Sequence, residues 1–166
     1  MAIADALIGE LEQEAVTTRR VLERVPGDKL SWKPHEKSMS LGQLALHVAQ
    51  VPGSVASIAV QNPGSFPENV EQGTATSVDE ALSALGDSVS TAKRIVQGFD
   101  DAAMLESWSL VAGGRTLMTM PRIGLLRAIM LNHWYHHRGQ LSVYLRLLDV
   151  PVPSIYGPSA DENPFA

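Results

Sequence analysis

The sequence predicts an all-α protein, a four-helix bundle with a short β-hairpin before the last helix, and three observations lead to this prediction. Four long segments repeat apolar residues at steps of three and four, which is typical of amphipathic helices. Stretches rich in proline, glycine or polar residues separate these segments. One short segment combines strand-forming residues with a glycine turn. Because 166 residues suffice for one hydrophobic core, we expect a single domain over residues 1–166.

Local signals set the ends of the expected elements. Ser77 and Glu80 are spaced as a capping box at the start of the third helix. Pro52 lies inside the second helix and should kink it just after His47, because proline lacks a backbone donor and crowds the preceding turn. Prolines after residue 150 end the fourth helix and leave a tail that should lie over the surface. The expected elements are helices over residues 3–25, 38–58, 78–97 and 121–148, and a hairpin over residues 108–120.

Charge and composition narrow the classes of function. The chain has 13 Lys and Arg against 18 Asp and Glu, a formal net charge of -5, so neither nucleic acid nor an anionic membrane is an expected partner. It shows no signal peptide and no run of about 18 apolar residues, which favours a cytoplasmic protein. Cysteine is absent. A bound metal must therefore use His, Asp or Glu, and a reactive thiol must come from a ligand.

Three of the five histidines, His133, His136 and His137, lie in one five-residue stretch of the fourth expected helix. His133 and His137 lie on one helical face, where two imidazoles can reach one ion. Both follow the inward-facing rhythm of that helix, as His47 does in the second helix, and bundle metal sites are commonly built from such facing side chains. His133 and His136 also share a face, and periodicity favours His137 only slightly. His35 follows a proline in an expected loop, outside the site.

A hydrogen-bonded core histidine is the ordinary interpretation of any one of these residues. Three neutral imidazoles buried together without an ion would leave donors and acceptors in need of partners, which costs free energy. Taken together, the residues support the metal-bound and metal-free interpretations about equally. Gln140, one turn beyond His137, either lines the site or is a buried structural amide. Arg138 lies off the histidine face, and we expect it to be a solvated surface residue.

Four motifs occur in a fixed order and together span nearly the whole chain. The chain thereby resembles the DinB-like family, also called YfiT-type metal-dependent hydrolases. The resemblance implies an up-down-down-up bundle, metal ligands at His47, His133 and His137 in preference to His136, and a homodimer. The motifs are SWKP at residues 31–34, SMSLGQLALHVA at 38–49, NHWYHHRGQL at 132–141 and PSIYGPSADE at 153–162.

Three imidazole ligands would leave open positions on an ion, as catalytic zinc sites do. Such a set suits zinc or nickel best, and also iron or copper. An open site can provide hydroxide near neutral pH or hold a thiol as thiolate. The resemblance adds thiol transferases and a mycothiol-dependent isomerase as activities found in the family. No inward Asp or Glu is evident as a general base, which favours a thiol over water.

The sequence thus leads to a functional hypothesis with two alternatives. The hypothesis is a divalent-metal-binding protein, a metal-dependent transferase or hydrolase that activates a low-molecular-weight thiol, or water, for a small-molecule substrate. No catalytic residue can be named from the sequence. In the first alternative, a non-catalytic, stress-related bundle uses the ion only to tie two helices together. In the second, the histidines are core residues and no metal binds.

Overall fold

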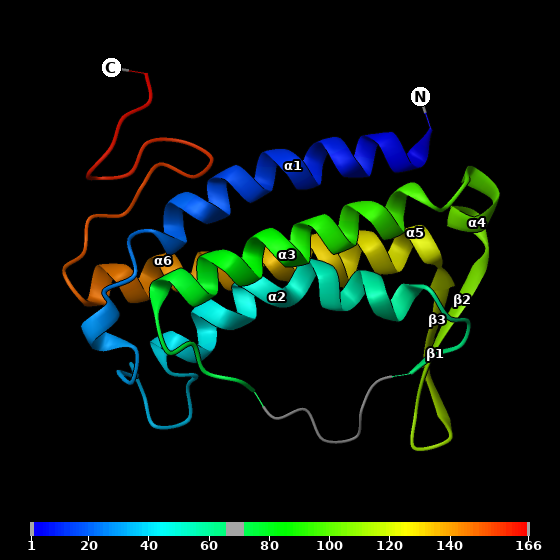
Figure 1. Cartoon of the computed structure of the whole chain (residues 1–166), viewed down its shortest axis with the longest axis horizontal. Helices are drawn as coiled ribbons and strands as arrows, with labels where there is room; N and C mark the ends of the chain where they lie inside the picture. Colours follow the sequence, from blue (N-terminus) through cyan, green and yellow to red (C-terminus); the bar gives the residue numbers. More distant parts are fainter. Residues whose placement is uncertain (1, 66–71, 166) are drawn as a thin grey trace.

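Four long helical segments pack side by side in the computed structural model, which describes residues 2–65 and 72–165. They are α1 (Ile3–Leu22), α2 (Leu41–Ala59), α3 (Val78–Gln97) and a composite last helix of α5 (Arg122–Leu125), η2 (Leu126–Asn132) and α6 (His133–Leu147). Figure 1 shows that α1 and the composite helix run in one direction, whereas α2 and α3 run in the opposite direction. The bundle is therefore up-down-down-up, and the predicted fold class is confirmed.

Serine side chains begin two of the long helices, and the sequence predicts one of these starts, at Ser77. Ser40 accepts a hydrogen bond from the backbone N–H of Gln43 at the start of α2. Ser77 accepts one from the backbone N–H of Glu80 at the start of α3. The Glu80 carboxylate accepts hydrogen bonds from the backbone N–H and the hydroxyl of Thr76, the residue before this cap. Each serine supplies an acceptor to a backbone donor that has no partner within its helix.

The last helix is not the uninterrupted α-helix expected over residues 121–148. Its middle segment, η2, is π-helical and ends directly before His133. A π-helical turn holds more residues than an α-helical turn, so it changes the face on which the following residues lie. The first helix also ends at Leu22, earlier than expected. Two short helices that the sequence did not predict are η1 (Gly27–Lys29) and α4 (Asp101–Leu105).

The predicted hairpin is present at the end of the bundle where α2 and α3 finish (Figure 1). Strand β2 (Ser107–Ala112) pairs antiparallel with β3 (Arg115–Pro121). The turn between them has Gly113 and Gly114 at φ values of 54° and 72°, a region that glycine enters without steric cost. A third strand, β1 (Gly64–Ser65), pairs in parallel with β2.

Trp108 attaches this small sheet to the helices. Its ring is fully buried, and its indole N–H donates to the carbonyl of Gln61 at 2.7 Å. Gly64 packs directly against the ring, which leaves no room there for a side chain. A lone hairpin is only marginally stable, so this anchor explains why the strands persist at the end of the bundle.

Arg138 is buried, and the expectation that it is a solvated surface residue is wrong. Only 1% of the side chain is exposed, and it forms an ion pair with Glu14 of α1 at 2.6 Å. It also donates to the Thr18 hydroxyl at 3.1 Å and to the Tyr156 hydroxyl. A guanidinium can be buried when an opposite charge and hydrogen-bond acceptors surround it, and α1 provides both.

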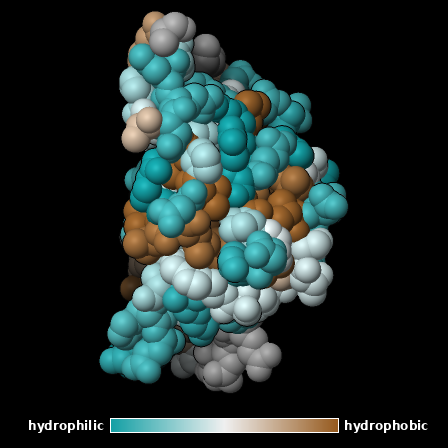
Figure 2. Space-filling view, turned by 90° about the vertical axis from the view of Figure 1, so that its left-hand side faces the viewer, coloured by the Kyte–Doolittle hydropathy of each residue, from teal (hydrophilic) through white to brown (hydrophobic). Residues whose placement is uncertain are grey.

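The tail after residue 150 forms no helix or strand among its described residues and lies over the end of the bundle where α1 and α6 finish (Figure 1), which agrees with the expected surface position. Glu162 pairs with Arg20 of α1, and Asp161 pairs with Arg146 of α6, so two carboxylates hold the tail. Figure 2 views the end of the bundle that carries the tail and shows hydrophobic side chains in mid-face, with hydrophilic ones above and below. Among the described helices, none is both long and apolar enough to cross a bilayer.

Candidate metal centre

His47 of α2 meets His133 and His137 of α6 inside the bundle, and we call these residues the three-histidine cluster. One ring nitrogen from each lies within 4.8 Å of the others. The Nε2 atoms of His133 and His137 are 2.6 Å apart. The ring centroid of His47 lies 5.3 Å from that of His133 and 4.4 Å from that of His137. The structure thus brings together the three residues that the sequence singles out.

The two remaining histidines lie outside the cluster. The ring of His136 is close to that of His137, with centroids 5.0 Å apart, but His136 is exposed and does not share the convergent arrangement. His35 is exposed in the segment before α2. Among residues 2–65 and 72–165, no Asp or Glu joins the cluster. Any ion held there would have three nitrogen ligands from the described protein.

The environment keeps the cluster uncharged near neutral pH. Burial, together with the neighbouring His137 and His133, which oppose another positive charge, lowers the pKa of His47 from 6.5 to about 4. Burial likewise lowers the pKa values of His133 and His137, although the hydrogen bond with Gln140 offsets part of the effect at His137. A neutral imidazole is the form that binds a metal ion, so protonation does not block the cluster at pH 7.

Gln140 orients one of the rings. Its Oε1 atom lies 2.7 Å from Nδ1 of His137. An amide oxygen can only accept, so Nδ1 carries the hydrogen and Nε2 of His137 presents a lone pair toward His133. Metal-binding histidines commonly have such a partner on the nitrogen that faces away from the ion. Gln140 is therefore in contact with the cluster, although its side chain lies at the surface.

Two buried nitrogens of the cluster, Nε2 of His47 and Nδ1 of His133, have no hydrogen-bond partner among the described residues. A buried polar atom without a partner costs free energy, and such atoms are uncommon in folded proteins. The unpartnered Nε2 of His47 lies in a cluster of neutral imidazoles. This donor set fits a divalent transition-metal ion, and the three-histidine cluster could hold one.

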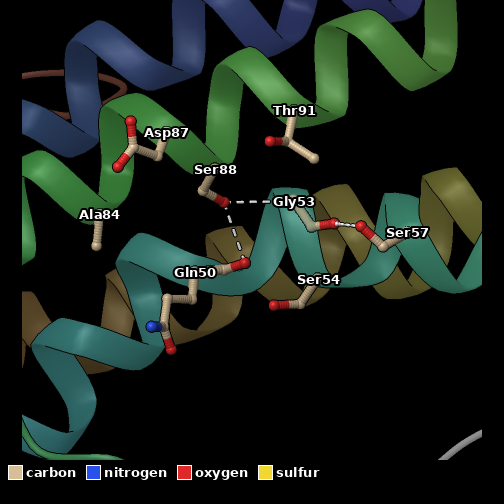
Figure 3. Close-up of a pocket in the computed structure, with 8 residues that line it drawn as sticks. All are labelled: Gln50, Gly53, Ser54, Ser57, Ala84, Asp87, Ser88 and Thr91. Atoms are coloured by element: carbon tan, nitrogen blue, oxygen red, sulfur yellow. Dashed lines mark hydrogen bonds between the residues drawn. The ribbon is translucent and has the colours of Figure 1, made fainter.

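A cavity of about 180 Å³ adjoins His47 and His133. Four apolar side chains line part of it, and two glutamines and a serine contribute amide and hydroxyl groups. A larger hollow of about 430 Å³ lies between α2 and α3, but hydroxyls, Asp87 and small residues line it, and no histidine reaches it (Figure 3). We therefore place the candidate site at the smaller cavity, whose other described lining residues are Gln50, Val51, Ser54, Val55, Ile58, Gln72, Gly73 and Ile129.

Sequence reasoning missed most of the residues that line this cavity. Gln50 and Ser54 lie three and seven residues after His47, so helical periodicity could have placed them on the same face. Ile129 belongs to the π-helical segment, which no sequence signal announced. Gln72 lies in the sequence between α2 and α3, and nothing in its local sequence points to the histidines.

Comparison with known proteins finds relatives that match nearly the whole chain. A sequence model of the DinB family matches residues 3–164. The uncharacterized protein YrdA of Bacillus subtilis (strain 168) is 26% identical over 163 residues, which cover 95% of this chain and 90% of YrdA. The crystal structure of a DinB-like protein from Bacillus cereus ATCC 10987 has a TM-score of 0.73 at 21% identity, covering 93% of this chain and 98% of that one. The DinB-like protein YjoA of Bacillus subtilis has a TM-score of 0.66 at 20% identity, covering 87% and 92% respectively.

Proposed function

The chain belongs to the DinB family, and from that premise we propose that it binds one divalent metal ion through His47, His133 and His137 and activates a low-molecular-weight thiol there. The observation that carries this proposal is the convergence of three neutral imidazoles around a buried, unpartnered nitrogen of His47. Zinc or nickel is the proposed ion, because both accept an all-imidazole ligand set. Iron and copper accept it as well.

The cluster has the composition of an open site. Catalytic zinc sites have three protein ligands and leave a position free, whereas structural sites are closed by four. With no carboxylate in the cluster among the described residues, three imidazoles would leave room for an exogenous ligand. A bound divalent ion would supply Lewis acidity and lower the pKa of a thiol or water placed there.

The surroundings favour a thiol over water as the activated group. A metal-activated water usually needs a nearby base, and no Asp or Glu of the described chain lies in the cluster. A thiol held as thiolate is already the reactive form and needs no such base. The cavity next to His47 is lined by four apolar side chains and by neutral polar groups, so we propose that the second substrate is small and largely apolar.

A non-catalytic metal-binding protein is the alternative function. The cluster joins two helices, since His47 is on α2 and the other two histidines are on α6. An ion held between them would cross-link the bundle and stabilise it, because metal binding adds to the free energy of folding. This alternative predicts metal-dependent stability without turnover.

Elemental analysis of untagged protein is the first test. We expect about one zinc or nickel ion per chain in the parent, and none in His47→Ala or His137→Ala. His136→Ala is the matched control, because it removes an exposed imidazole next to the cluster and should retain the ion. Absence of metal from the parent, even after incubation with zinc and nickel, would rule out the proposal.

A transfer assay separates the two functions. The metal-loaded protein is mixed with cysteine and 1-chloro-2,4-dinitrobenzene, and thioether formation is followed by absorbance. Turnover above the uncatalysed rate, lost in His137→Ala, supports the transferase. Full metal occupancy without turnover for a panel of small thiols and electrophiles would favour the non-catalytic alternative.

The homodimer stays a proposal, and sedimentation equilibrium of the purified protein tests it.

A further inference from the structure

Pro52 removes a backbone donor from α2 at a fully buried position, and a tryptophan of α6 supplies a replacement. In a regular helix the carbonyl of Val48 would accept a hydrogen bond from the N–H of residue 52. Proline has no N–H, so this carbonyl needs another donor inside the core. The indole N–H of Trp134 donates to it at 2.8 Å.

The side chain of Ser88 on α3 forms hydrogen bonds with backbone groups of α2 on both sides of Pro52, as Figure 3 shows. Its hydroxyl donates to the carbonyl of Gln50 at 3.0 Å and accepts from the N–H of Gly53 at 2.8 Å. The helices can approach this closely because residue 53 is glycine. A Cβ there would lie 2.9 Å from the backbone of Ser88. The part of α2 around Pro52 is thus fixed to α3 by Ser88 and to α6 by Trp134.

The Trp134 hydrogen bond connects the immediate neighbours of two residues of the three-histidine cluster. Val48 follows His47 on α2, and Trp134 follows His133 on α6. Both Val48 and the Trp134 ring are fully buried, so water does not compete for this bond. Metal–ligand distances tolerate deviations of only about 0.2 Å, so a small shift of α2 against α6 would be felt at an ion.

We propose that Trp134 is a positioning residue for the metal centre. Its indole N–H binds the carbonyl that Pro52 leaves without an intrahelical donor and so sets His47 against His133 and His137. This inference rests on the proposed metal site. In this inference the hydrogen bond holds α2 and α6 in register at the cluster, and the bulk of the ring is not sufficient for this.

Trp134→Phe tests the proposal, because it retains an aromatic ring and removes the donor. Trp108→Phe is the matched control: Trp108 is equally buried and also donates to a backbone carbonyl, at Gln61, but it anchors the sheet. Both variants are titrated with Co²⁺, whose visible spectrum reports its ligand geometry. We expect Trp134→Phe to weaken Co²⁺ binding about tenfold and alter the spectrum, as loss of an outer-shell partner does. Trp108→Phe should keep the parent affinity within about twofold, since it lies away from the cluster.

Urea unfolding of the metal-free variants separates positioning from general destabilisation. Both substitutions should lower stability, but only Trp134→Phe should change Co²⁺ binding. If Phe at position 134 prevents folding, β-(3-benzothienyl)alanine replaces Trp134, since it keeps the ring shape without the N–H, and the same loss of affinity is expected. In a Pro52→Ala background Val48 regains an intrahelical donor, so Trp134→Phe should cost less affinity there.

The outcomes distinguish this inference from the proposed function. If the parent binds no Co²⁺, the metal site is wrong and the positioning role fails with it. If the parent binds Co²⁺ and Trp134→Phe binds it with the same affinity and spectrum, the metal site stands and the positioning role is overturned. The positioning role would also be overturned if Trp108→Phe lost as much Co²⁺ affinity as Trp134→Phe. The same holds if Trp134→Phe lowered Co²⁺ affinity equally in the parent and in the Pro52→Ala background.

Discussion

Helix α6 carries two buried polar clusters on different faces, and they differ in how their hydrogen bonds are satisfied. On one face Arg138 pairs with Glu14 and donates to Thr18 and Tyr156, and the Tyr156 hydroxyl itself donates to Glu14 at 3.0 Å. On the other face is the three-histidine cluster, which contains two ring nitrogens without partners and no opposite charge among the described residues. His137 and Arg138 are adjacent in sequence, yet Arg138 lies in a cluster whose hydrogen bonds are satisfied and His137 lies in one that contains unpartnered nitrogens.

The difference separates a structural cluster from a binding site. The Arg138 cluster is complete without any ligand, because α1 and the tail supply its acceptors and its counter-charge. The three-histidine cluster offers lone pairs that the described protein leaves unused, and its rings are kept neutral. Burial of polar groups is therefore not by itself a sign of function. What marks the histidines is that one ring nitrogen from each lies within 4.8 Å of the others, while the buried Nε2 of His47 has no partner among the described residues.

The largest expected effect is on the Arg138 side. Arg138→Met leaves the Glu14 carboxylate buried without its partner, and losing one member of a buried ion pair typically costs about 3–5 kcal/mol. We expect urea unfolding to show a loss of this size in metal-free protein. Arg146→Met is the control, because its partner Asp161 is held at the surface and such pairs contribute about 0–1 kcal/mol. Equal losses in both variants would contradict the structural role of the Arg138 cluster.

Removing a member of the three-histidine cluster should act on metal binding and not on the metal-free fold. His47→Leu deletes a buried nitrogen without a partner, so metal-free stability should stay the same or rise by up to about 1 kcal/mol. Zinc affinity should fall more than about 100-fold, since loss of an outer-shell partner alone costs 10–100-fold. Competition titration with a chromogenic chelator measures the affinity. A large loss of metal-free stability would instead place His47 among the structural core residues.

A smaller effect is expected at Gln140, which orients His137 from the surface. Gln140→Ala should weaken zinc binding about tenfold, because the His137 ring loses the partner that fixes its tautomer. Its effect on the free energy of unfolding should stay within about 0.5 kcal/mol, as for other exposed positions. Gln140→Glu keeps an acceptor at Nδ1 and should restore the affinity. Unchanged zinc affinity in Gln140→Ala would leave this amide without a role at the cluster.

A pH dependence of stability is also expected, and it comes from His47. Burial and the neighbouring histidines lower its pKa in the folded protein to about 4 from an ordinary value of 6.5. Between pH 6.5 and 4 the unfolded chain therefore binds a proton that the folded chain does not, so acidification favours unfolding. We expect metal-free parent protein to lose stability over this window relative to His47→Leu. Parallel stability curves for the two proteins would show that His47 does not carry the effect.

Local sequence signals were sufficient for most of the fold. The apolar rhythm placed four helices, Ser77 marked the start of the third helix, and the glycine pair at residues 113–114 marked the hairpin turn. Each of these features depends on residues a few positions apart, which the sequence displays directly. The π-helical segment η2 was not foreseen, because its residues have the same apolar character as those of an α-helix.

For the candidate site, the sequence by itself determined which residues to examine, and the tertiary structure decided what surrounds them. Helical periodicity placed His133 and His137 on one face and His47 on another inward face, because that rhythm is a local property of the chain. The partners lie far away in sequence: Glu14 is 124 residues from Arg138, and Val48 is 86 residues from Trp134. Whether a buried polar group has a partner depends on such long-range contacts. Only the folded chain shows that Arg138 is satisfied and that the histidines are not.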